Sequence, residues 1–450
     1  MVYSVNNFWT VSNLSFISKV LEKAVLSRLM DHLVRNKLLE PFQSAYKSGH
    51  STETVLNAVH NFITSQLDEG RYVLLVLLDL SSAFDTVNHA ILLERLQSKY
   101  KLGGTVLSWF KSYVTKRFQH VKIEKVLSSQ RPLTTGVPQG SVLGPVLFSL
   151  YLAELSDVIR SHNIYFHHCA DDTQLLLAFD KDSVSFAFHK MEICIDAVST
   201  WLTNNQLKLN CDKTEFVVFR SRFSNVTPTF PTLNVGGEQI HISSTVRNLG
   251  AYFDQTMTLD HHVTNLCRSA NWQLRKISRL RKYLDNKSCE ILVHAFITSR
   301  LDFLNSLLSG LPDSSIRKLQ KIQNTAARIV KRKGRNCHIT PILKELHWLP
   351  ISFRIQFKLL LLAFRAHIMG EPVYLSQLLL RYIPTRALRS SNKSFLTLPK
   401  LRLKTYGCRS FQYSASILWN NLPDDIRTCS ELSVFKGLLK THLFSIAYTS

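Results

Sequence analysis

One stretch decides how this chain folds: Phe166-His167-His168-Cys169-Ala170-Asp171-Asp172-Thr173-Gln174-Leu175-Leu176-Leu177. Its two adjacent aspartates lie between two runs typical of strands, which predicts a β-hairpin with Asp171 and Asp172 at its tip. Neighbouring residues of a regular strand point to opposite faces, so only a turn lets both side chains serve one site. Like charges this close repel, and a divalent cation would compensate them. The alternative is a solvated turn, where aspartate is common.

A second acid follows a run that predicts a buried strand. Residues 72 to 78 are all apolar, too few to cross a membrane and typical of a central strand covered on both faces. Asp79 ends this run, and the carboxyl end of a strand is where strand-borne sites usually place their chemistry. Asp85 precedes apolar residues at helical spacing, which favours a role as a helix N-cap. Asp79 has no such structural role, so it is the stronger site candidate.

A loop rich in glycine and proline lies between these acids in the sequence. It reads Gly136-Val137-Pro138-Gln139-Gly140-Ser141-Val142-Leu143-Gly144-Pro145 and leads into an apolar stretch that predicts a helix. Glycine lets a backbone approach a flat ligand closely, and the side chain of Gln139 offers both a donor and an acceptor. Such a loop alone is weak evidence for a ligand-binding site. Its position in the sequence between Asp79 and Asp171 makes the three segments together a much more specific signal.

Three segments together resemble motifs A, B and C of reverse transcriptases. They are Leu-Asp-Leu-Ser-Ser-Ala-Phe-Asp-Thr-Val-Asn-His (78 to 89), the glycine-rich loop (136 to 145) and Cys-Ala-Asp-Asp (169 to 172). The similarity is greatest to LINE-type retrotransposons, which lack long terminal repeats, and it extends over nearly the whole chain. It implies an α+β right-hand polymerase with fingers, a palm built on an antiparallel sheet, and a helical thumb. We expect fingers and palm over residues 1–255, a basic helical thumb over 256–335, and the mixed carboxyl-terminal region of LINE-type proteins over 336–450.

The resemblance implies RNA-templated DNA synthesis by two-metal nucleotidyl transfer. Asp79, Asp171 and Asp172 would bind Mg²⁺, with Mn²⁺ as an alternative, because hard cations prefer oxygen ligands. Lys213 lies in a segment similar to motif D and would protonate the leaving pyrophosphate. A turn lysine without any catalytic role is the alternative for Lys213.

Four further residues would contact the incoming nucleotide: Lys47, Phe84, Gln139 and Gly140. Lys47 occupies a fingers position where the family usually has arginine, and it would neutralise phosphate charge without arginine's bidentate fork. Phe84 would crowd the 2′ position of the sugar and favour deoxynucleotides. The alternatives are a solvated loop lysine and a core phenylalanine.

The charge of the chain favours a polyanionic partner. Net charge is +23 and the isoelectric point is about 9.7, as expected for a protein that binds phosphate backbones. In the expected thumb, the candidate nucleic-acid contacts are Arg275, Lys276, Arg279, Lys318 and Lys321. By composition alone these cations would form a solvated helix face. The expected partners are an RNA template, a DNA primer and deoxynucleoside triphosphates, with a separate endonuclease as a further candidate.

Other patterns exclude several classes of protein. The 8 cysteines form no Cys-x-x-Cys pair, so neither a zinc module nor a disulfide framework is predicted. No signal peptide or membrane-spanning run is evident, which favours an intracellular protein, nuclear and/or cytoplasmic, without a membrane partner. The basic run from Lys331 to Arg335 is either a nuclear localisation signal or a linker that contacts RNA.

Periodicity predicts several further elements. Residues 17 to 33 form a helix whose apolar face includes Ile17, Val20, Leu21, Ala24 and Leu29. Further helices are predicted at about 53–67 and 313–333. The segment 207–219 is expected to turn into a strand, and 246–253 resembles the primer-grip hairpin of the family.

Three departures from the family bear on activity: Trp9-Thr10 replaces the usual Arg-Pro, Lys47 replaces arginine, and Cys169 replaces an aromatic residue. The chain also begins close to the family's polymerase region, which suggests a truncated copy that lacks the usual upstream endonuclease. The alternative functions are therefore an inactive retrotransposon relic or a co-opted nucleic-acid-binding protein, and a protein-interaction scaffold.

Overall fold

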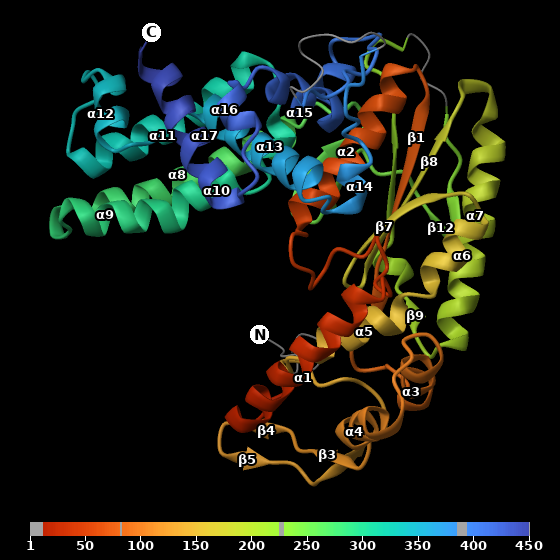
Figure 1. Ribbon diagram of the computed structural model, residues 1–450. Helices are drawn as coiled ribbons and strands as arrows, with labels where there is room; N and C mark the ends of the chain where they lie inside the picture. The colour runs from red at the N-terminus through yellow and green to blue at the C-terminus, as the bar shows by residue number, and fades with distance from the viewer. Residues whose placement is uncertain (1–11, 82, 225–228, 385–393, 450) are drawn as a thin grey trace.

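The computed structural model describes residues 12–81, 83–224, 229–384 and 394–449 (Figure 1). A twisted sheet lies at the centre, a helical group with a small ribbon extends from one end of it, and a second helical group projects sideways. Trp9 and Thr10, which carry one departure from the family pattern, lie outside the described residues, as does Ser82 of the first motif. The arrangement agrees with the predicted α+β class.

The central sheet has the strand order β10-β1-β8-β7, and every neighbouring pair is antiparallel. Its strands are β1 (Tyr72–Leu78), β7 (Tyr165–Cys169), β8 (Asp172–Phe179) and β10 (Glu215–Phe219). Val73 and Leu75 of β1 enter one hydrophobic core, while Leu74 and Val76 enter another on the opposite face. A strand covered on both faces needs apolar residues throughout, so the predicted central strand and antiparallel sheet are confirmed.

Helices cover both faces of this sheet. One face packs on α2 (Thr52–Asp68), whose first turn is closed by a capping box between Ser51 and Thr54. The other face and its lower end carry α3 (His89–Ser98), α4 (Gly104–Val114), α5 (Gly144–Leu152), α6 (Leu155–Ser161) and α7 (Val184–Asn204). The helix predicted at 53–67 is confirmed.

Short strands form separate two-stranded ribbons. Their bounds are β2 (Leu80–Ser81) with β9 (Lys208–Leu209), β3 (Arg117–Gln119) with β6 (Arg131–Leu133), β4 (Lys122–Ile123) with β5 (Val126–Leu127), β11 (Leu233–Val235) with β12 (Glu238–Ile240), and β13 (Thr245–Asn248) with β14 (Ala251–Asp254). The hairpin β13–β14 occupies the segment that resembles the primer grip. The strand predicted at the end of 207–219 is β10, which pairs with β1.

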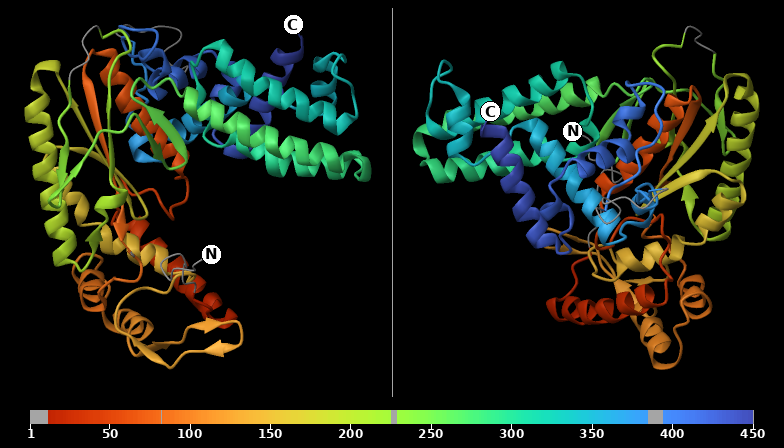
Figure 2. Two further views of the ribbon diagram at one scale, coloured as in Figure 1. Left: turned by 180° about the vertical axis from the view of Figure 1, so that it is seen from behind. Right: turned by 45° about the horizontal axis from the view of Figure 1, so that its top comes forward.

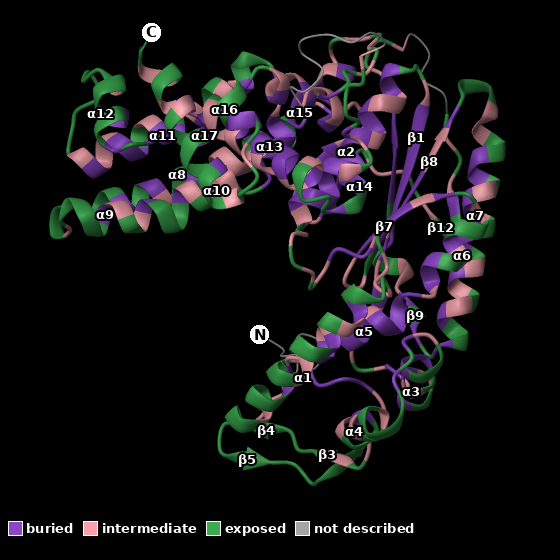
Figure 3. Ribbon diagram, in the orientation of Figure 1, coloured by how far each residue is buried: buried purple, intermediate pink, exposed green. Residues whose placement is uncertain are grey.

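The helix α1 (Phe16–Arg35) exists as predicted, but its predicted buried face is wrong. Of that face only Leu29 is buried; Ile17 is 79% exposed, whereas the charged Glu22 is 1% exposed. Much of α1 is exposed (Figure 3). The Glu22 carboxylate accepts hydrogen bonds from the amides of Val142 (2.7 Å) and Leu143 (3.1 Å). These amides precede α5, where a negative charge is favourable, so a specific polar contact decided which face turns inward.

The second helical group begins with α8 (Asp260–Leu280), α9 (Asn286–Val293), α10 (Ser299–Asp302) and α11 (Asp313–Lys331). The predicted helix is confirmed as α11, and Leu319, Ile322, Ala326 and Val330 form a buried apolar stripe along it. These helices project away from the sheet in all views (Figures 1 and 2).

The last third of the chain adds α12 (Ile339–Glu345), α13 (Ile351–Ile368), α14 (Val373–Ser376), α15 (Phe411–Asn420), α16 (Asp424–Arg427) and α17 (Leu432–Thr449). Both α14 and α15 pack on α2 (Figure 2). One hydrophobic core runs from Val55 and Val73 through Leu319 to Leu359 and Trp419. The three expected divisions of the chain stay predictions, because elements on both sides of residue 336 share this core. No helix in the described ranges is long and apolar enough to cross a membrane.

Candidate active site

The paired aspartates lie at a tight turn between β7 and β8. Cys169 pairs with Asp172, so Ala170 and Asp171 are the two turn residues and Asp172 is the first residue of β8. Ala170 has a positive φ of 60°, a left-handed conformation that is uncommon for a residue with a Cβ. The predicted hairpin is confirmed, with Asp171 in the turn itself.

Asp79 lies beside this turn because of the register between β1 and β8. Leu78 pairs with Thr173, which places the next residue, Asp79, level with Asp172. Oδ2 of Asp79 accepts a hydrogen bond from the Asn210 side chain at 3.2 Å and lies 3.6 Å from Nζ of Lys213. Sequence-distant residues therefore meet at one end of the sheet.

The three carboxylates influence one another. Desolvation raises the pKa of Asp171, the charge of Asp79 raises it further, and Lys213 opposes the shift. Desolvation, followed by the charges of Asp171 and Asp79, raises the pKa of Asp172 to about 6. An added cation would relieve this repulsion.

The donor set fits a hard divalent cation whose coordination is completed by substrate. Within the described residues, no group of three or more His, Cys, Asp or Glu side chains is placed so that it could hold a metal ion by itself. Mg²⁺ commonly takes one or two protein carboxylates and fills its remaining positions with water and substrate phosphates. Asp79, Asp171 and Asp172 supply oxygen donors of this kind, and their role as metal ligands stays a prediction.

The first two motifs are joined backbone to backbone. The amide of Gly136 donates to the carbonyl of Val87, and the amide of Val137 donates to that of Phe84, both at 2.8 Å. Gly136 has a φ of 87°, and a Cβ there would meet the carbonyl oxygen of Asp85 at 2.8 Å, so only glycine allows this approach. The glycine-rich loop is thereby fixed next to Phe84.

The N-cap prediction for Asp85 is wrong. The helix α3 begins later than expected, and its N-cap is Asn88, whose side chain accepts from the amides of Ala90 and Ile91. Asp85 is exposed and instead accepts a long hydrogen bond, of 3.3 Å, from the side-chain amide of Gln139. The carboxylate therefore links the two motif loops.

The other sequence-predicted nucleotide residues occupy the same loops. Phe84 is half-buried and stacks on Phe148 with 4.6 Å between ring centroids. Gln139 is half-buried, and its backbone carbonyl accepts a hydrogen bond from the backbone amide of Ser12. Gly140 is exposed with a φ of 97°. Cys169, which replaces the usual aromatic residue, is half-buried, and burial raises the pKa of its thiol to about 11.

A comparison with known protein families decides the identity of this arrangement. The family model described as reverse transcriptase (RNA-dependent DNA polymerase) matches residues 5–253, more than half of the chain. The chain belongs to the reverse transcriptase family.

Its relatives among characterised proteins come from mobile elements. The RNA-directed DNA polymerase from mobile element jockey of Drosophila melanogaster is 26% identical over 335 residues, 73% of this chain and 36% of the relative. The probable RNA-directed DNA polymerase from transposon BS of the same fly is 25% identical over 342 residues, with the same shares. The chain thus spans about a third of the length of these relatives. The expected resemblance to LINE-type reverse transcriptases is confirmed.

Among solved structures, a telomerase from Candida tropicalis aligns over 96% of this chain and 57% of its own, at 12% identity and a TM-score of 0.40. We draw no conclusion from a likeness at that level.

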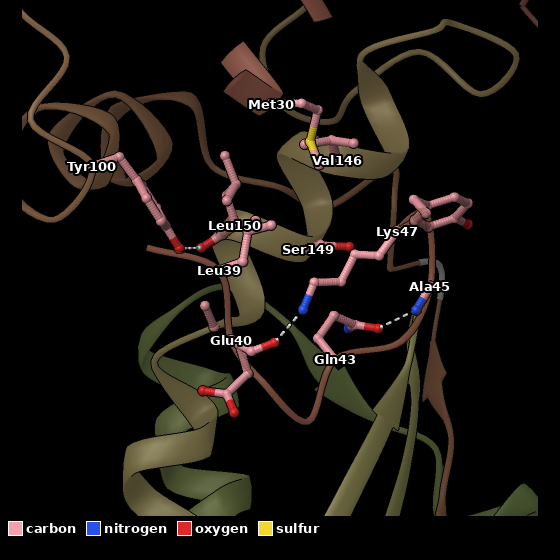
Figure 4. Close-up of a pocket in the computed structure, with 12 residues that line it drawn as sticks. Met30, Leu39, Glu40, Gln43, Ala45, Lys47, Tyr100, Val146, Ser149 and Leu150 are labelled. Atoms are coloured by element: carbon pink, nitrogen blue, oxygen red, sulfur yellow. Dashed lines mark hydrogen bonds between the residues drawn. The ribbon is translucent and has the colours of Figure 1, made fainter. Parts of the chain in front are cut away.

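In this reverse transcriptase, Lys47 points into a pocket of the fingers rather than toward open solvent (Figure 4). Its Nζ donates to the carbonyl oxygen of Glu40 at 2.7 Å. Desolvation lowers the pKa of Lys47 to about 8, although the charges of Glu40 and Glu371 oppose the shift. Its predicted contact with a triphosphate stays a prediction.

No sequence pattern indicated a role for Gln43, which lines the same pocket (Figure 4). Its side chain accepts from the amide of Ala170 at 3.1 Å and donates to the carbonyl of the same residue at 3.1 Å. Gln43 is buried although it belongs to a loop of polar residues. Only the fold brings it to the Asp171 turn, because 127 positions separate it from Ala170.

A second cavity, of about 420 Å³, lies between the acids and the β13–β14 hairpin. Asp79, Asp172 and Lys213 line one part of it, and Arg247 and Asn248 of β13 line another. The predicted motif D lysine and the hairpin that resembles the primer grip therefore face one space. Lys213 itself is exposed.

Residues of α8, of α11 and of the segments that follow them line a third cavity, a basic groove of about 890 Å³ in the region predicted to be the thumb. Of its described lining residues, eight are Arg or Lys and none is Asp or Glu. Three of the five predicted contacts line it: Arg275, Arg279 and Lys321. The other two, Lys276 and Lys318, are exposed outside it, and Nζ of Lys276 lies 3.4 Å from the centre of the Trp272 ring.

Proposed function

We propose that this chain copies RNA into DNA by two-metal nucleotidyl transfer. The observation that supports this most is the meeting of Asp79 with the Asp171-Asp172 turn at one end of the palm sheet, beside the joined glycine-rich loop. The family match supports the same activity. Burial, followed by the charges of Asp171 and Asp79, raises the pKa of Asp172, and such shifts are common at functional sites.

Each residue would have a distinct role in this reaction. Bound Mg²⁺ would favour ionisation of the primer 3′-hydroxyl and offset charge on the triphosphate. Asp79, Asp171 and Asp172 would supply the negative charge that holds it, with Mn²⁺ as an alternative. Lys213 lies beside Asp79 and would donate a proton to the leaving pyrophosphate.

The loops would select the nucleotide. Phe84 is braced by Phe148 and by the hydrogen bond between its carbonyl and Val137, which would keep its ring fixed against the sugar 2′ position. Gln139 and Gly140 would line the template and nucleotide pocket. Lys47 would leave the Glu40 carbonyl to meet the triphosphate.

The basic groove would hold the template–primer duplex. A surface with eight cations and no described acid attracts phosphate backbones of any sequence. RNA template, DNA primer and deoxynucleotides are thus the proposed partners; a separate endonuclease and a nuclear or cytoplasmic location stay predictions.

The same groove supports a second candidate function. The groove would bind nucleic acid without the metal site. Cys169 supplies less packing surface beside the catalytic turn than an aromatic residue would. A relic or co-opted protein that binds nucleic acid without polymerising is therefore the alternative.

Primer extension separates the two. The purified chain is given an oligo-primed RNA template, Mg²⁺ and deoxynucleotides and compared with Asp171→Asn. Incorporation that the variant loses, while both proteins bind the duplex equally, supports the polymerase. No incorporation by a folded parent protein that binds duplex in a salt-sensitive manner contradicts it and leaves the binding protein.

A further inference from the structure

The fingers segment 42–45 is hydrogen-bonded to the strand that leads into the catalytic turn. The amide of His168 donates to the carbonyl of Phe42 at 2.9 Å, and the amide of Ser44 donates to the carbonyl of His168 at 3.0 Å. Between these bonds Gln43 forms a parallel bridge with His168. The segment thus lies along β7 like an added strand, and it ends at the turn.

The side chain of Gln43 then clamps the turn residue itself. Its Oε1 accepts from the amides of Ala170 (3.1 Å) and Ala45 (3.0 Å), and its Nε2 donates to the carbonyl of Ala170 (3.1 Å). Ala170 needs such support, because a left-handed conformation is unfavourable for alanine and persists only where its surroundings impose it. Since Asp171 follows directly, the same bonds restrain the backbone from which its side chain projects.

A residue of the carboxyl-terminal region holds this segment from behind. The buried hydroxyl of Tyr374 lies 2.9 Å from Oγ of Ser44 and 2.7 Å from Oγ1 of Thr54. Its ring packs edge-on against the ring of His167 of β7, with 4.7 Å between the ring centroids, and against the ring of His50, with 5.8 Å between the centroids. One side chain therefore ties the fingers loop, the helix α2 and the palm sheet together.

We propose that Gln43 is a positioning residue that fixes the Asp171 turn, and that Tyr374 holds Gln43 in place. Residues 336–450 would then be part of the active-site architecture. The sequence of this region does not predict that role. The local claim concerns only the backbone at Ala170. Its catalytic consequence rests on the proposed polymerase function.

Amide exchange tests the local claim without any activity. In full-length protein labelled with ¹⁵N-alanine, the amides of Ala170 and Ala45 both report on the oxygen of Gln43. Gln43→Met removes that acceptor and should speed exchange of both amides about tenfold or more, relative to the other alanines. Gln43→Glu keeps an acceptor but loses the donor to the Ala170 carbonyl, so both amides should exchange more slowly than in Gln43→Met and faster than in the parent protein.

Tyr374→Phe tests the support from behind. Loss of the hydroxyl should speed exchange at Ala170 and Ala45, whereas Tyr448→Phe should not. Tyr448 is the matched control because its hydroxyl also donates a hydrogen bond within the carboxyl-terminal region, to the carbonyl of Trp348. Unchanged exchange at Ala170 in Gln43→Met, or faster exchange at every alanine in Tyr374→Phe, would overturn the proposal.

Kinetics then test the catalytic consequence. Gln43→Met should lower kcat about tenfold and raise the Mg²⁺ concentration needed for half-maximal rate, because a small displacement of a reacting group is costly. Its duplex affinity in EDTA should equal that of the parent protein. Faster exchange with unchanged kcat would refute the positioning role, whereas a parent protein that incorporates no nucleotide would refute the polymerase function and leave the exchange result standing.

Discussion

The ammonium group of Lys213 lies 3.6 Å from Oδ2 of Asp79, and both groups are open to solvent in part. This contact allows two roles for the lysine. An exposed ion pair contributes little free energy, about 0 to 1 kcal/mol, whereas a proton donor to a leaving group contributes roughly 10²-fold or more to the rate. The loss of activity on removing the lysine should therefore be small for an ion pair and large for a proton donor.

Replacing Lys213 by leucine distinguishes them. If the lysine donates a proton, we expect Lys213→Leu to lower kcat about 10²-fold with little change in KM for the nucleotide. Single-turnover primer extension is the measurement, and Lys208→Leu, which removes an exposed lysine of the neighbouring strand β9, is the control. A loss below about threefold would assign Lys213 only to the ion pair with Asp79.

Lys47 should make nucleotide binding dependent on pH. Its pKa is lowered to about 8, so its ammonium is charged below that pH and is lost as the pH rises through it. If it meets the triphosphate, KM for the nucleotide should rise roughly tenfold between pH 7 and pH 9. Lys47→Arg should remove this dependence, because arginine stays charged. An equal rise in both proteins would show that another group is responsible.

Phe84 should decide between deoxynucleotides and ribonucleotides. In Phe84→Val the smaller side chain should relax discrimination, lowering the ratio of kcat/KM for deoxynucleotides over ribonucleotides about 10²-fold. The comparison variant is Phe148→Leu, which removes the stacking partner but keeps the Phe84 ring and should therefore lower the ratio less. If Phe84 is only a core residue, both variants should lose stability while the ratio stays constant.

The groove between α8 and α11 divides the basic thumb residues into two groups. The double variant Arg275→Ala with Arg279→Ala removes two groove cations, and the slope of log K against log salt for duplex binding should fall by about 2. Lys276→Ala with Lys318→Ala removes the same charge outside the groove and should change the slope less. Equal slopes for the two doubles would show that the whole thumb surface attracts duplex without regard to the groove.

Local patterns predicted much of the palm. The uniformly apolar run before Asp79 became the central strand β1, and the predicted hairpin formed with Asp171 in its turn and Asp172 at the start of β8. Both follow from short-range rules. A strand that is apolar on both faces must be packed against other elements on both sides, and a reversal of the chain needs a turn. The apolar stripe of α11 was predictable for the same reason.

Other expectations failed because a different hydrogen bond, to a distant or a nearby residue, decided the local structure. Periodicity correctly identified α1 as a helix but not its buried face, since Glu22 finds the amides before α5 while Ile17 stays in solvent. Asp85 looked like a cap until Asn88 and Gln139 were placed around it. In each case a hydrogen bond to a residue far away or slightly downstream outweighed the local preference.

The polar residues of α2 show the same limit most clearly. Glu53, Asn57, Asn61 and Asp68 would suit a solvated helix face, yet all four are buried and bond to residues between 306 and 412. A buried polar group must be paired to be tolerated, and no pattern within one helix says what pairs it.

The sequence by itself determined the order of the motifs, the strand and turn that carry the acids, and the basic character of the thumb. Only the tertiary structure decided that Asp79 stands level with Asp172, that Gln43 clamps Ala170, and that Tyr374 supports this clamp. The physical reason is that periodicity and turn propensity act over a few residues, whereas the pairing of polar groups depends on which distant segments the core brings together.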